Sequence, residues 1–232
     1  MTRAFPRKPG ETVTKIEVQS RAAVVRWDVQ GSLTPGELGA RCEAALDMLR
    51  AGGAAVQLAF LCDTRPVHRT LFADHAPDDL PEAAGEYRGT PGSALMQAER
   101  VVKVLRRPGL RVRDPGVAAG AVASEMSGLA LRVREIWASP QAGDAAYADL
   151  AELTYGFLRI QPYLDGNGHV CRIMLPLLAA RSGLARRSAW TLHPRPYDHV
   201  MSLCLQWYPD HPALLSAYLR HWFGETGGAV LR

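Results

Sequence analysis

The chain has 232 residues, 47% of them hydrophobic and 22% charged, which is enough for a substantial core and unlike a disordered chain. A formal net charge of +4 at pH 7 does not by itself indicate nucleic acid or a membrane surface as a partner. Four scattered cysteines without a C-x-x-C pair argue against a zinc site or disulfide framework. The sequence has neither a signal-peptide pattern nor an apolar run of the ~20 residues that span a bilayer. We therefore expect a cytoplasmic protein without membrane contact.

The N-terminal part of the chain is expected to contain a tail, short strands and one helix. Residues 1–11 are polar and predict a loose tail, and the β-branched residues of 12–29 predict a short N-terminal hairpin or a pair of strands. A Thr-Pro pair at 34–35 is typical of a helix start, and this helix should run to about Arg50, where two glycines follow.

The remaining chain, residues 55–232, is predicted to form the main domain, preceded by an extension over 1–54. Its helical patterns cover 55–75 (with a break near 63–66), 117–138, 143–160, 167–182, 196–207 and 212–223. A loop rich in Asp, Pro and Gly at about 74–96 leads to a β-hairpin centred on a Pro-Gly turn. The predicted fold class is therefore mainly α with one or two small hairpins.

The hairpin at about 101–114 alternates apolar and basic residues. Its apolar positions are Val102, Val104, Leu110 and Val112. A basic two-stranded ribbon can enter a DNA groove, which gives a nucleic-acid-binding hypothesis. The modest total charge favours a solvated hairpin instead, and an exposed strand edge could also pair with a segment of a protein target.

One segment, residues 161–172, carries the pattern of a ligand site. A helical pattern ends near Ile160 and another opens near Asn167, with Gly166 and Gly168 on either side of that asparagine. Glycines allow positive φ and a close approach of the backbone to a ligand. The unpaired N–H groups of a helix's first turn, together with the helix dipole, form a cradle for an anion.

The side chains around this turn favour a phosphate ligand. His169 and Arg172 are three residues apart and share a helix face, and a guanidinium matches phosphate oxygens. Asp165 beside an anion calls for a bridging cation, for which Mg²⁺ is suited. The alternative is a helix-capping loop, with Asp165 or Asn167 as the N-cap and Arg172 solvated. The His and Arg at helical spacing favour the phosphate site.

The segment resembles the signature of the Fic (Fido) domain family, which is His, Pro and an aromatic residue, an acidic residue with Gly-Asn-Gly, and two arginines three apart. The matching residues are Pro162, Tyr163, Asp165, Gly166, Asn167, Gly168 and Arg172. Residues 67–72 and 85–89 resemble the family segments that precede its flap hairpin. The resemblance implies a Fic-type helical bundle in which hairpin 101–114 is the flap that docks the target.

The resemblance also implies roles for the residues. Asp165 would hold Mg²⁺, the turn at 166–168 would hold the inner phosphates of ATP or another nucleotide, and His169 and Arg172 would reach the outer phosphates. Gln161 stands where the family has its general-base histidine, and His169 replaces the first arginine. Glutamine is no base near neutral pH, and losing a general base costs ~10²–10⁴ in rate. Phosphoryl transfer nevertheless depends mainly on positioning and charge neutralisation.

The predicted function is transfer of a nucleotidyl (AMP-like) or related phosphoryl group to a Ser, Thr or Tyr hydroxyl of a protein target, attenuated by Gln161. The alternative is a pseudoenzyme that binds a nucleotide for regulation, and a third hypothesis is nucleic-acid binding through the basic hairpin. No Glu is followed by Gly or Asn, so the family's inhibitory pattern is absent. Regulation is then expected from an antitoxin-like partner, from self-association or from Gln161 itself. Export as a translocated effector is an open alternative to a cytoplasmic location.

Overall fold

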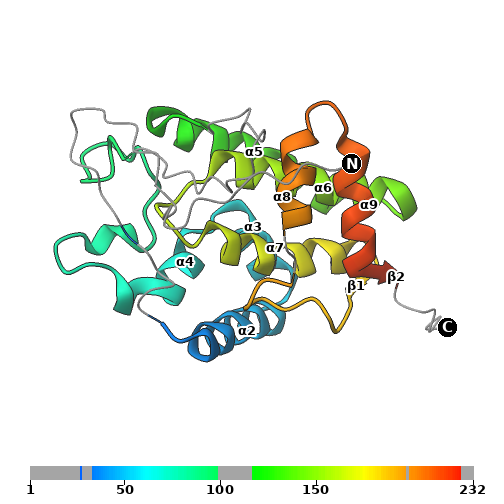
Figure 1. The fold of residues 1–232 in the computed structure, drawn as a ribbon, viewed down its shortest axis with the longest axis horizontal. Helices are drawn as coiled ribbons and strands as arrows, with labels where there is room; N and C mark the ends of the chain where they lie inside the picture. The colour runs from blue at the N-terminus through cyan, green and yellow to red at the C-terminus, as the bar shows by residue number, and fades with distance from the viewer. Residues whose placement is uncertain (1–26, 28–32, 99–116, 197–198, 226–232) are drawn as a thin grey trace, which may run out of the picture.

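The structure is a computed structural model that describes residues 27, 33–98, 117–196 and 199–225 (Figure 1). Helices dominate this part of the chain, as predicted. They are α2 (Pro35–Ala51), α3 (Gly53–Cys62), α4 (Arg65–Phe72), α5 (Val122–Ala138), α6 (Gly143–Ile160), α7 (Asn167–Arg181), α8 (His199–Trp207) and α9 (Pro212–Trp222). Short 3-10 turns lie at Ala73–His75, Pro81–Ala83 and Ala119–Ala121. Two strands, β1 (Leu184–Arg186) and β2 (Phe223–Glu225), complete the fold.

The helix boundaries follow from local chemistry. Thr34 caps α2 in a capping box with Glu37, in which each side chain bonds the other residue's backbone N–H, and Pro35 occupies the first turn. The predicted break near 63–66 is confirmed, because α3 ends before Asp63 and α4 starts anew with a proline in its first turn.

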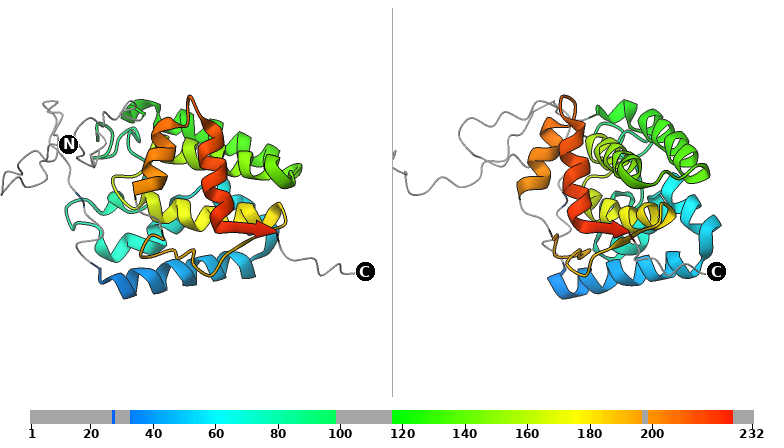
Figure 2. Two further views of the ribbon diagram at one scale, coloured as in Figure 1. Left: turned by 45° about the vertical axis from the view of Figure 1, so that its right-hand side comes forward. Right: turned by 90° about the vertical axis from the view of Figure 1, so that its right-hand side faces the viewer.

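Helix α7 is the centre of the core. Its residues from Val170 to Ala179 are all buried, and all of them except Arg172 are apolar, as expected of a helix that is covered on every side. Helices α6 and α2 pack against it, α5 packs on the far side of α6, and α8 and α9 line one side of the bundle (Figures 1 and 2). Buried residues of α2 belong to the same core. The proposed boundary between 54 and 55 stays a prediction.

Strands β1 and β2 form a small antiparallel sheet that the sequence did not predict. Leu184 pairs with Glu225, Ala185 with Gly224 and Arg186 with Phe223. The predicted last helix, 212–223, therefore ends at Trp222 as the chain turns into β2. The two predicted hairpins, at 12–29 and 101–114, lie outside the described residues, apart from Trp27.

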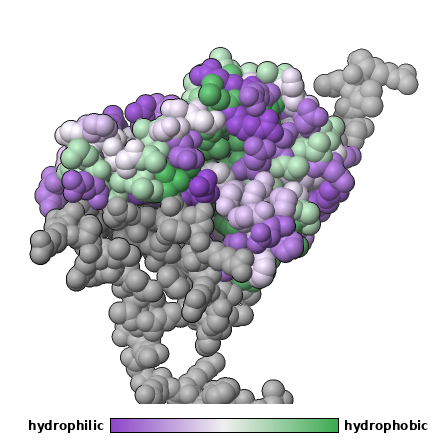
Figure 3. All heavy atoms as spheres, turned by 90° about the horizontal axis from the view of Figure 1, so that it is seen from above, coloured by the Kyte–Doolittle hydropathy of each residue, from purple (hydrophilic) through white to green (hydrophobic). Residues whose placement is uncertain are grey.

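The described surface mixes hydrophilic and apolar residues, as the view from above shows (Figure 3). Leu131 on α5 and Trp207 on α8 are among its exposed apolar side chains. None of the helices in the described ranges is both long and apolar enough to cross a membrane.

Candidate functional site

The site begins where helix α6 ends, at Gln161. This residue has φ 49° and ψ 66°, and it is the only residue other than glycine with positive φ among those the structure describes. A left-handed backbone costs an ordinary residue about 1–2 kcal/mol. Its N–H donates to the Phe157 carbonyl and closes the helix. Strain of this kind is found where the surrounding structure fixes the backbone, often at functional sites.

The buried guanidinium of Arg88 fixes that helix end. It donates four hydrogen bonds to backbone carbonyls, those of Gln161 (2.8 Å), Ile160 (3.0 Å), Val117 (3.1 Å) and Ala98 (3.2 Å). Arg88 is fully buried, so these carbonyls replace the water that the cation has lost. In the sequence, Arg88 stands out only as part of the segment 85–89 that resembles the family, and no local signal indicates its role.

Two of these bonds reach the residues on either side of the predicted flap. Residues 98 and 117 bracket the hairpin segment, and one side chain joins both to the carbonyl of Gln161. The chain therefore leaves and re-enters the described structure close to Gln161. The predicted docking positions themselves, Val102, Val104, Leu110 and Val112, lie outside the described residues and stay predictions.

The turn that follows is closed by the side chain of Asn167. Its Oδ1 accepts from the N–H of Tyr163, and its Nδ2 donates to the carbonyl of the same residue, both at 2.9 Å. The N-cap of α7 is Gly166, with φ 77°, and this glycine has no side chain with which to cap the helix. The alternative interpretation, with Asp165 or Asn167 as the N-cap, is therefore wrong.

His68, on α4, is hydrogen-bonded to this turn. The Gly85 N–H donates to its Nδ1 at 3.0 Å, so Nε2 carries the proton and donates to the Asp165 carbonyl at 3.0 Å. The ring stacks on Tyr163 at 3.7 Å, and the Tyr163 hydroxyl bonds that of Thr64 at 2.6 Å. Burial lowers the pKa of His68 to about 3, so the ring is neutral.

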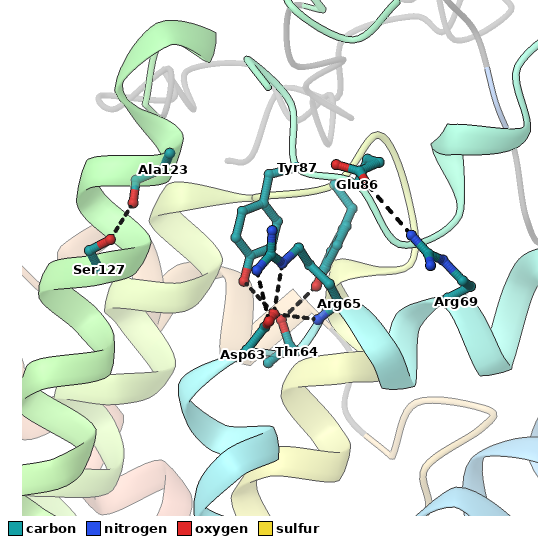
Figure 4. A network of polar contacts seen from close by, with 9 residues as sticks. Asp63, Thr64, Arg65, Arg69, Glu86, Tyr87, Ala123 and Ser127 are labelled. Atoms are coloured by element: carbon teal, nitrogen blue, oxygen red, sulfur yellow. Dashed lines mark hydrogen bonds and ion pairs between the residues drawn. The ribbon is translucent and has the colours of Figure 1, made fainter. Parts of the chain in front are cut away.

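A polar network on the outer side of α4 holds the loop that contains Gly85 (Figure 4). Arg65 donates two hydrogen bonds of 2.8 Å to Asp63, which keeps the pKa of that carboxyl below its usual value. The Tyr87 hydroxyl reaches the same carboxylate at 3.5 Å, and Arg69 pairs with Glu86 at 3.5 Å. The first link joins the loop to Asp63, between α3 and α4, and the second joins it to the middle of α4.

Arg172 lies beside the first turn of α7. Its side chain is buried, and its Nε donates to the Leu192 carbonyl at 2.6 Å. Its Nη1 lies 3.2 Å from the place that a Cβ on Gly168 would occupy, so the guanidinium runs along the helix start. A Cβ on Gly166 would meet Phe72 at 2.5 Å and His68 at 2.9 Å, so this position admits glycine alone.

His169 is buried on the same helix turn and pairs with a second histidine. Its Nε2 lies 3.1 Å from Nδ1 of His193, and its ring makes an edge contact with Phe72. Burial, and then the charge of Arg172, lowers the pKa of His193. Nothing local in the sequence links His193 to the start of α7, and its contact with His169 follows from tertiary packing.

Asp165 is partly exposed at the turn. No group of three or more His, Cys, Asp or Glu side chains in the described ranges could hold a metal ion by itself. A single carboxylate beside a phosphate cradle nevertheless fits Mg²⁺, which binds through one or two carboxylates together with substrate phosphates. The residues present are thus compatible with a cation that arrives with its nucleotide.

No protein-family model and no curated protein matches the chain. Solved structures do. The N-terminal Fic domain of a putative cell filamentation protein (a VirB-translocated Bep effector) from Bartonella quintana, with bound ADP, is 17% identical. The match covers 91% of this chain and 95% of that one, with a TM-score of 0.56. The BepC protein of Bartonella tribocorum, with bound AMPPNP, is 13% identical over 88% of this chain and 95% of that one, with a TM-score of 0.53.

These similarities define the class of fold. The chain has the helical fold of the Fic domains, as the motif at 161–172 predicted.

Proposed function

We propose that this protein binds a nucleoside triphosphate with Mg²⁺ at the start of α7 and transfers a nucleotidyl or related phosphoryl group to a protein hydroxyl. The observation that carries the proposal is the start of α7 itself. It is a helix N-terminus whose N-cap is a glycine in a left-handed conformation, Gly166, with the buried guanidinium of Arg172 alongside. Helix N-terminus, close backbone approach and guanidinium are the elements of a phosphate site.

Three further observations support an anionic ligand there. The Asn167 side chain is committed to the turn and not to the helix N–H groups. Arg172 places a guanidinium, whose planar fork matches phosphate oxygens, beside the same turn. The structures of similar fold from Bartonella contain ADP and AMPPNP.

Asp165 would hold Mg²⁺, which would join the phosphates and neutralise their charge when bound. Asn167 and His68 set the turn that carries this carboxylate. Arg172 would bind phosphate oxygens, and His169, in place of an arginine, would add a hydrogen-bond donor near them. The N–H groups at 167 and 168 would bind the inner phosphates.

Gln161 decides between two functions. Its side chain cannot take a proton at neutral pH, but its amide oxygen can accept a hydrogen bond from a target hydroxyl and orient it. Slow transfer follows from orientation without a base. A binding module that senses a nucleotide is the second candidate, and the glutamine at this position is the observation in its favour. With the family's inhibitory glutamate pattern absent, an antitoxin-like partner or self-association would supply regulation.

The two candidates are separated by incubating the purified chain with a cell lysate and ATP labelled on either the α- or the γ-phosphate, then repeating this with GTP, CTP and UTP. An α-label on proteins indicates nucleotidyl transfer, and a γ-label indicates phosphoryl transfer. Asp165→Asn should abolish the label, while Asp144→Asn, an exposed carboxylate at the start of α6, should not. Nucleotide binding without any label leaves the binding module, and no binding of any nucleotide refutes both candidates.

A further inference from the structure

His68 contacts the turn at its least constrained peptide. Asn167 holds the first part of the turn through its two hydrogen bonds to Tyr163. The carbonyl of Asp165 belongs to the peptide that precedes Gly166, and a glycine can adopt backbone angles that other residues cannot. The His68 Nε2 lies 3.0 Å from that carbonyl. It also lies 2.9 Å from the place of a Cβ on Gly166, so the imidazole occupies space that a side chain at position 166 would need.

The imidazole is itself fixed in ring orientation and tautomer. An amide N–H only donates, so the 3.0 Å contact from Gly85 makes Nδ1 the acceptor and leaves the single proton on Nε2. Stacking on Tyr163 at an interplanar angle of 13° and an edge contact with Phe72 hold the ring plane. The ring is fully buried, so water does not compete for either nitrogen.

We propose that His68 is a positioning residue of this site, whose Nε2–H fixes the peptide between Asp165 and Gly166. The inference rests on the proposed function for its ligand, but its structural part is independent of it. With that carbonyl held, the direction of the chain into α7 is set, and with it the N–H groups of Asn167 and Gly168. Without the donor, Gly166 can rotate, and the carboxylate and the N–H groups no longer face one ligand together.

Two conservative variants separate the bonds of His68. In His68→Asn the amide lies near the position of Nδ1, so it can accept from Gly85 but does not reach Asp165. In His68→Gln the amide lies near the position of Nε2, so it can donate to Asp165 while the bond to Gly85 is lost. Hydrogen exchange, measured by mass spectrometry on peptides covering 83–88 and 162–170, reports each bond without any ligand. Calorimetry with MgATP reports the site.

For His68→Asn we expect faster exchange in 162–170 alone and an affinity for MgATP about 3- to 10-fold lower, the usual effect of one hydrogen bond. For His68→Gln we expect faster exchange in 83–88 and an affinity within about two-fold of wild type. Equal loosening of both segments by both variants, or unchanged exchange in 162–170 of the Asn variant, would overturn the proposal.

A wild type that binds no nucleotide would refute the proposed function, and the exchange measurement would still decide the role of His68. If neither variant folds, ¹⁵N NMR of the wild-type imidazole at neutral pH gives the answer. A proton on Nε2 that is protected from solvent is expected. A proton on Nδ1 would contradict the assignment.

Discussion

Alanine at Gly166 and alanine at Gly168 should have opposite effects on the free energy of unfolding. Gly166 has φ 77°, and its new Cβ would lie 2.5 Å from Cε2 of Phe72 and 2.9 Å from Nε2 of His68. The left-handed backbone costs about 1–2 kcal/mol for a residue with a Cβ. Overpacking against two buried rings adds about 1–3 kcal/mol. Gly166→Ala should therefore destabilise the fold by about 2–5 kcal/mol.

Gly168 is helical, and alanine there gains up to about 1 kcal/mol from helix propensity. Its Cβ would lie 3.2 Å from Nη1 of Arg172, which is tighter than ordinary contact. The guanidinium must move, so Gly168→Ala should weaken MgATP binding while leaving the fold intact.

Urea denaturation of both variants measures the first effect, and calorimetry of the Gly168 variant measures the second. Gly156→Ala serves as a control, because it adds the same methyl group to a helix away from the site and meets only the Leu129 side chain at 3.0 Å. Equal stability of the Gly166 variant and wild type, or unchanged MgATP affinity of the Gly168 variant, would refute this account of the turn.

Three further predictions concern Gln161, Arg88 and His68. Gln161→His should raise the rate of transfer or self-modification by up to ~10²–10⁴ without loss of stability, because histidine tolerates a left-handed backbone and adds a base. The double variant with His169→Arg controls for the missing arginine. Nucleotide binding without label in either variant would leave the binding module. Arg88→Met should cost at least about 3 kcal/mol in a denaturant titration because four carbonyls lose their donor, and a loss under about 1 kcal/mol would contradict that role. The fold lowers the pKa of His68 to about 3, so between its ordinary pKa of about 6.5 and pH 3 only the unfolded chain takes up this proton. The free energy of unfolding should therefore decrease by up to about 1.4 kcal/mol for each unit that the pH is lowered through this range. His68→Gln should show a shallower decrease, and a pH profile identical to that of wild type would contradict the prediction.

The helices could be predicted because their signals are local. Thr34, Pro35 and Glu37 indicate the start of α2, and α6 occupies Gly143–Ile160 as its apolar pattern predicted. Strands β1 and β2 could not be predicted. Each has three residues, and their pairing depends on chain segments far apart in sequence. A period of two cannot be recognised over so short a stretch.

The same distinction applies to the site. The turn and the start of α7 are contiguous in sequence, so the ligand pattern at 161–172 was visible. The supports come from elsewhere, His68 from α4, Arg88 from a loop and His193 from the segment after β1. Their contacts follow from tertiary packing alone. The local signals for His68 were its place among the apolar residues of the amphipathic α4 and the resemblance of residues 67–72 to a family segment.

The most direct test of the account is calorimetry of MgATP binding to wild type, Arg172→Ala and Arg181→Ala. Both arginines lie on α7 and donate through Nε to a backbone carbonyl, Arg172 to that of Leu192 and Arg181 to that of Trp137. Arg181 lies in the last turn of α7, at the end opposite the proposed site. Both variants should lose stability. The account predicts that Arg172→Ala weakens binding by about 1.5–3 kcal/mol while Arg181→Ala leaves it unchanged. Equal affinity of wild type and Arg172→Ala would contradict the central claim that the start of α7 is the phosphate site.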